Sequence, residues 1–354
     1  MPQLDGLRAV AVTGVVLQHY HLFERGAEFG VHLFFVLSGF LITRILMKSR
    51  SAIESRGVSW QHAFRQFYIR RALRIFPLYY LVLLVVVALN AHGARENALW
   101  LFTYTINLKM AAQGWYIPNF AHFWSLAVEE QYYLVWPCLI LLLPRRGLIP
   151  GAVILTAIGP VFRLALAIWW LYFSRTGSPL NTYISTPTAL DSLGIGSLIS
   201  IVSSMHSTRS ESRGSIALAT MAVAGLIVGA VIANAWWIFI DTIAAVLFGW
   251  LIFRAAAGFK GITGWLLSAP PLVFTGRISY GIYVFHPLIP VAALAVGKSL
   301  GITIPDGTIG TIIFVVLTLL VATVSWYSFE RPLNNLKKRF PPAEHAFTGF
   351  QSVA

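Results

Sequence analysis

Long apolar segments recur along the whole chain, and they constrain its fold more than any other feature. Ten stretches of about twenty residues are apolar enough to cross a bilayer core of about 30 Å as helices. They lie at residues 7–24, 29–47, 75–91, 122–143, 149–172, 188–204, 215–233, 236–253, 273–297 and 308–329. Charged residues make up only 11% of the 354-residue chain, far below the share in soluble proteins. We therefore expect an all-α, polytopic integral membrane protein with about ten transmembrane helices around a central cavity.

The distribution of basic residues predicts how these helices are oriented. If the N-terminus is cytoplasmic, 20 of the 26 basic residues lie on the cytoplasmic side and five lie outside, with Arg163 inside a span. Such an excess of positive charge is typical of cytoplasmic loops. We expect a multi-pass protein of the cell inner membrane with both termini cytoplasmic, a transmembrane domain over residues 1–340 and a short cytoplasmic tail over 341–354. The net charge of +13 then needs no nucleic-acid partner.

The first apolar segment carries two ionisable residues on one helix face. Arg8 and His19 are eleven residues apart, which on a helix returns to within about 20° of the same direction, about 16 Å further along. Both are expected to point into one lumen, with Asp5 placed to pair with Arg8. The simpler alternative is a core histidine and an arginine that reaches the membrane surface.

Positive charge is concentrated between residues 44 and 74, where eight basic residues accompany a single acid, Glu54. Arg71 and Arg74 share a helix face, and Arg70 lies beside them. Two guanidinium groups at this spacing can bind one phosphate between them. Binding of anionic lipid at the membrane surface is the alternative.

Acidic residues inside apolar segments indicate a functional site, because carboxylates at membrane depth rarely serve packing alone. Glu129 and Glu130 are adjacent on a helix, so they point about 100° apart and cannot both face one point. One is expected to carry chemistry and the other to form a structural pair, for which Arg163 is a candidate. For Asp191 and Asp241, roles at a helix end or in a polar network are favoured over catalysis.

His286 precedes Pro287, which breaks the hydrogen-bond ladder of its helix and predicts a kink beside a cavity. A rise of about 1.5 Å per residue places His19, His286 and Glu130 at one level, slightly past the membrane midplane. The arginine cluster lies on the cytoplasmic side of that level. This arrangement suits a ligand whose anionic head stays near the cytoplasm while its reactive end reaches the middle of the membrane.

The ordered set of motifs resembles the membrane-bound acyltransferase family 3 over nearly the full length of the chain. The matching stretches are residues 4–9 (LDGLRA) with His19, 30–42, 71–77 with the spacing of Arg71 and Arg74, 123–134, 278–280 with His286, and 329–332. One departure is Ala189, since the family pattern has an arginine two residues before Asp191.

This resemblance implies transfer of an acyl group, most often acetyl, from cytoplasmic acyl-CoA to a hydroxyl at the outer side, with acetyl-CoA as donor substrate and no metal. His19 would act as base or transient acyl carrier, with Arg8 in the same lumen and Glu129 or Glu130 orienting the imidazole. The presumed contacts to the CoA phosphates would be Arg71, Arg74 and Arg70. The other residues expected around the cavity are Asp5, Ser38, Ser279, Tyr280, His286 and Asp191.

The expected acceptor is a cell-surface or exported glycan or glycolipid. O-acylation of a small secreted metabolite, such as a macrolide or a lipochitooligosaccharide, is the alternative. A proton-coupled transporter is a more distant alternative, because no internal repeat is found and paired arginines have no evident purpose in a proton relay. We expect no appended hydrolase-like domain. In a two-component arrangement a separate extracytoplasmic transferase would complete the transfer; otherwise this domain would act alone.

Overall fold

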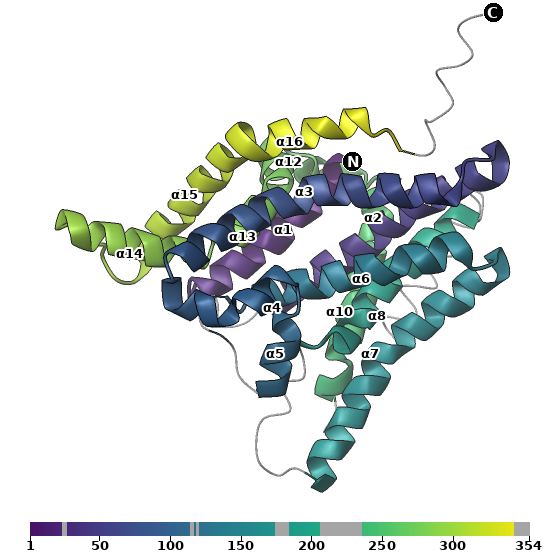
Figure 1. Ribbon diagram of the computed structural model, residues 1–354, viewed down its shortest axis with the longest axis horizontal. Coiled ribbons are helices and arrows are strands. Elements are labelled where there is room, and N and C mark those ends of the chain that lie inside the picture. Colours follow the sequence, from purple (N-terminus) through teal and green to yellow (C-terminus); the bar gives the residue numbers. More distant parts are fainter. Residues whose placement is uncertain (23–26, 114–116, 118–119, 174–183, 206–235, 343–354) are drawn as a thin grey trace, which may run out of the picture.

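The computed structural model describes residues 1–22, 27–113, 117, 120–173, 184–205 and 236–342. Within these residues every regular element is a helix (Figure 1). The elements of the first half are α1 (Pro2–His19), α2 (Ala27–Arg56), α3 (Trp60–Ala88), a 3-10 helix (Ala91–Asn97), α4 (Ala98–Phe102), α5 (Ile106–Gln113), α6 (Phe123–Leu142) and α7 (Arg145–Phe173). The second half contains α8 (Thr186–Met205), α10 (Trp236–Ala257), α11 (Gly261–Leu267), α12 (Pro270–Arg277), α13 (Ser279–Phe285), α14 (Leu288–Leu300), α15 (Thr308–Ser325), a π turn (Trp326–Glu330), α16 (Arg331–Asn335) and a 3-10 turn (Leu336–Arg339).

Six of the described helices are long and apolar enough to cross a membrane. They cover Ala27–Arg56, Trp60–Ala88, Arg145–Trp169, Thr186–Met205, Phe239–Ala257 and Thr308–Arg339. Helices α13 and α14 would form a seventh span if they are counted together. They are bent by 56° relative to each other at the predicted break after His286. The chain is thus a multi-pass membrane protein.

The remaining predicted spans are less apolar or lie outside the described residues. Two of them coincide with α1 and α6, in which charged side chains lower the mean hydropathy: Asp5 and Arg8 in α1, Glu129 and Glu130 in α6. The predicted span over residues 215–233 lies outside the described residues. Ten transmembrane helices therefore stay a prediction.

The helix α1 lies inside the bundle, where it contacts α2, α10, α12 and α13 (Figure 1). Around it, α2 packs along α8, and α8 packs along α7. The apolar windows of α2 and α8 are each 67% buried, against 17% for the helix over residues 308–339. The central helices are therefore α1, α2 and α8, whereas α15 exposes most of its surface.

Glycine residues allow α2 and α8 to approach closely. A Cβ atom added at Gly39 of α2 would lie 2.0 Å from the Leu193 carbonyl oxygen of α8. A Cβ added at Gly196 of α8 would lie 2.1 Å from the Val36 carbonyl oxygen of α2. Small residues that let backbones meet in this way are typical of helix contacts in membranes.

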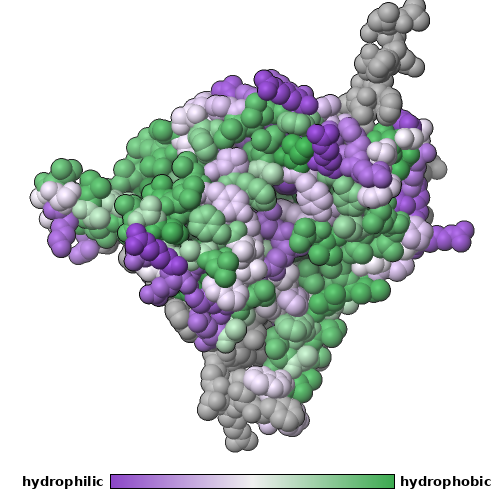
Figure 2. All heavy atoms as spheres, in the orientation of Figure 1, coloured by the Kyte–Doolittle hydropathy of each residue, from purple (hydrophilic) through white to green (hydrophobic). Residues whose placement is uncertain are grey.

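The outer surface is apolar over much of its area. Figure 2 shows apolar side chains over α15, at the upper left, and over α6 and α7, at the lower right. Exposed residues there include Ile312 and Leu320 on α15, Leu134 on α6, and Ile154 and Val161 on α7. Exposed aliphatic side chains on long helices are expected where a protein faces lipid.

Candidate active site

A cavity between α1, α2, α3, α6 and α13, which we call the central cavity, contains most of the residues singled out from the sequence. Those that line it are Arg8, Ser38, Arg71, Arg74, Glu129, Glu130, Ser279 and Tyr280. Ser125, Tyr133 and Tyr283 add polar side chains that the sequence analysis did not assign to the site. The central cavity therefore brings arginines, carboxyl groups and hydroxyl groups from five helices into one space.

Both glutamates of α6 line the central cavity. Glu129 accepts a hydrogen bond from the Ser38 hydroxyl, which also lies 2.7 Å from the Tyr133 hydroxyl. Glu130 is the next residue around the helix and lines the same space. The prediction that only one of the two would face the site is wrong, because the cavity covers a broad stripe of α6 at positions 126, 129, 130 and 133.

The arginines concentrate positive charge in the central cavity. Arg8 pairs with Asp5 at 2.7 Å, as the three-residue spacing predicts. The guanidinium group of Arg71 lies over the Tyr133 ring, with 5.0 Å between Cζ and the ring centroid. Within the described part of the chain, neither Arg71 nor Arg74 has a carboxylate within the 4.0 Å of an ion pair. Guanidinium groups without a close counter-ion attract anionic ligands.

His19 lies at the end of α1, where the helix backbone orients its ring. Its Nδ1 lies 2.8 Å from the Val15 carbonyl oxygen. Because a carbonyl can only accept a hydrogen bond, Nδ1 carries the proton, and Nε2 of the neutral ring keeps its lone pair. The side chain of His19 is exposed.

Two further histidines lie next to His19, and we call the three the histidine cluster. The rings of His19 and His286 are 4.9 Å apart between centroids, and those of His286 and His122 are 5.4 Å apart. The depth estimate put His19 and His286 at one level, and the structure shows that their rings are also in contact. Glu130, which was expected at the same level, lines the central cavity with the arginines. The sequence analysis missed His122, since no spacing connected it with the other two histidines.

Comparison with known proteins identifies the family. A family model described as an acyltransferase domain matches residues 1–329. The chain belongs to this acyltransferase family. The resemblance seen in the sequence motifs is thereby confirmed.

The acyltransferase is similar to longer curated proteins. It is 28% identical to the peptidoglycan O-acetyltransferase OatA of Listeria monocytogenes, over 94% of this chain and 56% of the relative. It is 27% identical to the O-acetyltransferase OatA of Staphylococcus aureus, over 96% of this chain and 58% of the relative. The chain therefore spans little more than half the length of these relatives. No solved structure matches it significantly.

In the acyltransferase, hydrogen-bonded side chains separate the central cavity from the histidine cluster. The Tyr283 hydroxyl lies 2.5 Å from Ser125 Oγ and donates to the His122 carbonyl oxygen at 3.0 Å. His19 is not among the residues that line the central cavity. The prediction that Arg8 and His19 share one lumen is therefore wrong in this structure, because Tyr283 of α13 lies between the two compartments.

The sequence analysis expected a carboxyl group of α6 to orient the His19 ring, and the structure does not show this. That orientation comes from the α1 backbone, through the Val15 carbonyl oxygen. Glu129 is instead bound to Ser38. The helix register alone could not reveal this difference, since it depends on how α6 is rotated relative to α1.

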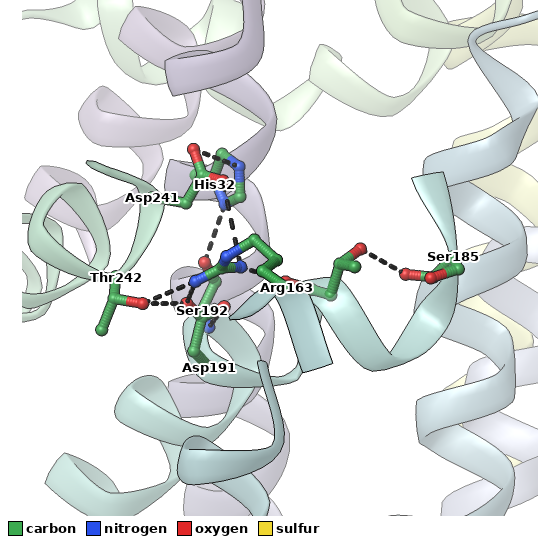
Figure 3. Close-up of polar contacts among 8 residues, drawn as sticks. His32, Arg163, Ser185, Asp191, Ser192, Asp241 and Thr242 are labelled. Atoms are coloured by element: carbon green, nitrogen blue, oxygen red, sulfur yellow. Dashed lines mark hydrogen bonds and ion pairs between the residues drawn. The ribbon is translucent and has the colours of Figure 1, made fainter. Parts of the chain in front are cut away.

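Asp191 lies in a buried polar network away from the central cavity (Figure 3). Its Oδ2 accepts from Arg163 Nη2 at 2.5 Å and from the Thr242 hydroxyl at 2.5 Å. Arg163 Nη1 also lies 3.9 Å from Asp241, which in turn lies 3.2 Å from His32 Nε2. The network joins α2, α7, α8 and α10.

This network corrects two predictions from the sequence. Arg163 pairs with Asp191 and Asp241 rather than with a glutamate of α6. Asp191 is a network residue, as its position in the sequence favoured. The expectation that it would lie around the cavity is wrong, because it does not line the central cavity. Ala189 replaces the arginine of the family pattern, and the guanidinium group beside Asp191 is that of Arg163 on α7.

Three other predicted site residues lie next to the central cavity without lining it. Asp5 lines an adjoining cavity, and His286 is buried in the histidine cluster. Arg70 donates to the carbonyl oxygens of Lys337 and Phe340 at 3.0 and 2.9 Å. Arg70 does not line the central cavity because it precedes Arg71 by one position and so points in another direction around α3.

Proposed function

We propose that this acyltransferase moves an acetyl group from acetyl-CoA to a hydroxyl group of a cell-surface glycan. The observation that carries the proposal is the juxtaposition of Arg8, Arg71 and Arg74 in the central cavity with His19 on the other side of Tyr283. In acetyl-CoA the phosphates and the thioester lie at opposite ends of a long arm. Binding of the phosphates by the arginines would direct the thioester toward the histidine cluster.

His19 acts as the base in this proposal. Its Nε2 takes the proton of the acceptor hydroxyl as the hydroxyl oxygen attacks the thioester carbonyl, the C–S bond breaks, and the CoA thiolate receives the proton from the imidazolium. In the two-step version, Nε2 attacks the thioester carbonyl first, the C–S bond breaks and the CoA thiolate leaves. The acceptor hydroxyl then attacks the acyl group, the C–N bond to histidine breaks, and the hydroxyl proton passes to the thiolate or to solvent. Either route requires the Tyr283 side chain to move, since it separates the thioester from His19.

The relatives and the charge distribution support the proposed acceptor and location. The name of the Listeria monocytogenes relative supports a cell-wall glycan as acceptor. A location in the cell inner membrane with cytoplasmic termini is supported by the grouping of basic residues. Arg50 of α2 and Arg145 of α7 both bind Glu54, at 2.8 and 2.5 Å, so the basic ends of these two helices lie together. If the acetyl group leaves on a carrier, a separate extracytoplasmic transferase completes the transfer.

Turnover of acetyl-CoA tests the donor half of the proposal. Purified protein in nanodiscs is followed for thiol release with and without short peptidoglycan chains, and CoA binding is measured by calorimetry. His19→Ala is expected to lower turnover at least about 100-fold with unchanged CoA affinity, because the base is lost but the arginines remain. Arg71→Ala/Arg74→Ala is expected to weaken CoA binding by about tenfold or more.

The matched control is Lys338→Ala/Arg339→Ala, which removes the same charge from exposed side chains and should leave both readouts unchanged. Folded wild-type protein that neither binds nor cleaves acetyl-CoA would refute the donor assignment. Turnover that rises with a secreted small molecule but not with glycan would refute the acceptor assignment alone.

A further inference from the structure

A second cavity adjoins the central cavity, and we call it the side cavity. The two share Arg8, Arg74 and Tyr280 in their linings, so they meet at these residues. The side cavity also reaches Arg277, the last residue of α12, and Trp326, which follows α15. A ligand bound in the central cavity can therefore extend into the side cavity beside Arg74.

Positive charge exceeds negative charge in the side cavity. Its lining contains three guanidinium groups and two carboxyl groups. The former belong to Arg8, Arg74 and Arg277, and the latter to Asp5 and Glu330. Asp5 already pairs with Arg8 at 2.7 Å, and Glu330 is buried and accepts a hydrogen bond from a nearby serine at 3.0 Å. Among the residues that the structure describes, Arg74 and Arg277 have no carboxylate within 4.0 Å. The surplus charge favours an anionic ligand.

Helix packing fixes the place of Arg277. The preceding residue, Gly276, lies so close to α1 that a Cβ atom added there would be 1.8 Å from the Asp5 carbonyl oxygen. The end of α12 is therefore held against the first turns of α1, beside Arg8. This contact places the Cα of Arg277 at the side cavity, and its exposed side chain is part of the lining.

Trp326 adds a flat aromatic surface to the side cavity. Its side chain is only partly buried, so part of the ring is accessible to a ligand. Aromatic rings stack on purine bases, and guanidinium groups bind phosphate through paired N–H donors. A ligand that satisfies both kinds of side chain carries a purine base and phosphate groups. The adenosine of CoA has this chemistry, with a 3′-phosphate on its ribose and a pyrophosphate leading to the thioester arm.

We infer that the side cavity binds the 3′-phosphoadenosine end of the donor. Arg277 contacts the 3′-phosphate, Trp326 stacks on the adenine, and Arg74 contacts the pyrophosphate where the two cavities meet. The inference rests on the proposed function and adds a selectivity to it: the enzyme distinguishes CoA from 3′-dephospho-CoA through Arg277.

Binding of CoA and of 3′-dephospho-CoA to the full chain, in nanodiscs without anionic lipid, tests this inference. Wild-type protein should bind CoA at least about tenfold more tightly than 3′-dephospho-CoA, because one charge-assisted contact is lost in the latter. Arg277→Ala should weaken CoA binding to the level of 3′-dephospho-CoA and leave 3′-dephospho-CoA binding unchanged. Trp326→Leu should weaken both ligands by the same factor.

Arg146→Ala is the matched control, because Arg146 is exposed on α7 and lines neither cavity. Arg277→Gln serves as a second variant if the alanine variant is unstable. Equal affinity of the wild type for the two ligands, or an Arg277 variant that still prefers CoA, would overturn the inference while the donor assignment survives. Wild-type protein that binds neither ligand would instead refute the proposed function.

Discussion

The buried ion pair of Arg163 and Asp191 shows how a charged side chain is accommodated inside this protein. Arg163 and Asp191 are almost completely buried, at 2% and 0% exposure, and they lie 2.5 Å apart. A buried ion is costly without a counter-ion, whereas the pair together is tolerated. Thr242 and Asp241 add further contacts to the same group of residues. The network therefore contributes mainly by fixing how α7, α8 and α10 meet.

Asp191→Ala is expected to destabilise the protein by about 3–5 kcal/mol, because the buried guanidinium group of Arg163 loses its closest carboxylate. Thermal unfolding in detergent measures the effect. Arg163→Leu/Asp191→Leu should recover part of the loss, since both charges are removed together. Asp306→Ala, at an exposed position, is the control and should melt like the wild type. Equal stability of Asp191→Ala and wild type would show that the pair has no such role.

At the scale of elements, close contacts between helices determine which residues face the central cavity. The α2–α8 contact depends on Gly39 and Gly196, where backbones meet without side chains. From α2, Ser38 and Phe34 then line the cavity on the side that faces α6 and α13. A wider separation of α2 and α8 would rotate or shift these residues.

Gly196→Ala is expected to lower stability by about 1–3 kcal/mol, because its Cβ would lie 2.1 Å from the Val36 carbonyl oxygen. Gly14→Ala is the matched control: it is also in a helix, and outside the nearby backbone of that helix no atom of the described residues lies within 4 Å of its added Cβ. That control should be neutral or slightly stabilising, as alanine favours helix over glycine. Similar melting of the two variants would contradict the role assigned to the contact.

At the scale of the whole molecule, the functional groups follow an order along the bundle axis. The surplus arginine charge lies near the start of α1, and the histidine cluster lies near its end, about 16 Å away for an eleven-residue separation. Tyr283 and Ser125 lie between them. This order suits a donor that enters from one face of the membrane and an acceptor that approaches from the other.

Site-specific labelling tests the orientation that this order requires. In a Cys138→Ser background, Arg146→Cys should react with a membrane-impermeant maleimide only after right-side-out vesicles are opened. Asp306→Cys should react in sealed vesicles, because the loop before α15 is expected outside. The reverse pattern would place the arginines on the outer side and remove the route for cytoplasmic acetyl-CoA.

Local features were predictable from the sequence because they depend on neighbours within one helix. The helical membrane architecture follows from the apolar segments. The Arg8–Asp5 pair follows from a three-residue spacing, and the bend after His286 follows from Pro287. The spacing of Arg71 and Arg74 likewise predicted that the two share a helix face, and both line the central cavity.

Contacts between helices were decided only by the tertiary structure. They depend on the rotation of each helix about its axis and on the distance to its neighbours, neither of which is encoded by spacing along one segment. For this reason Glu129 and Glu130 lie with the arginines, Arg163 pairs with Asp191, and Arg277 comes beside Arg8. The sequence by itself determined the helices and their polar residues; packing determined which of those residues share a site.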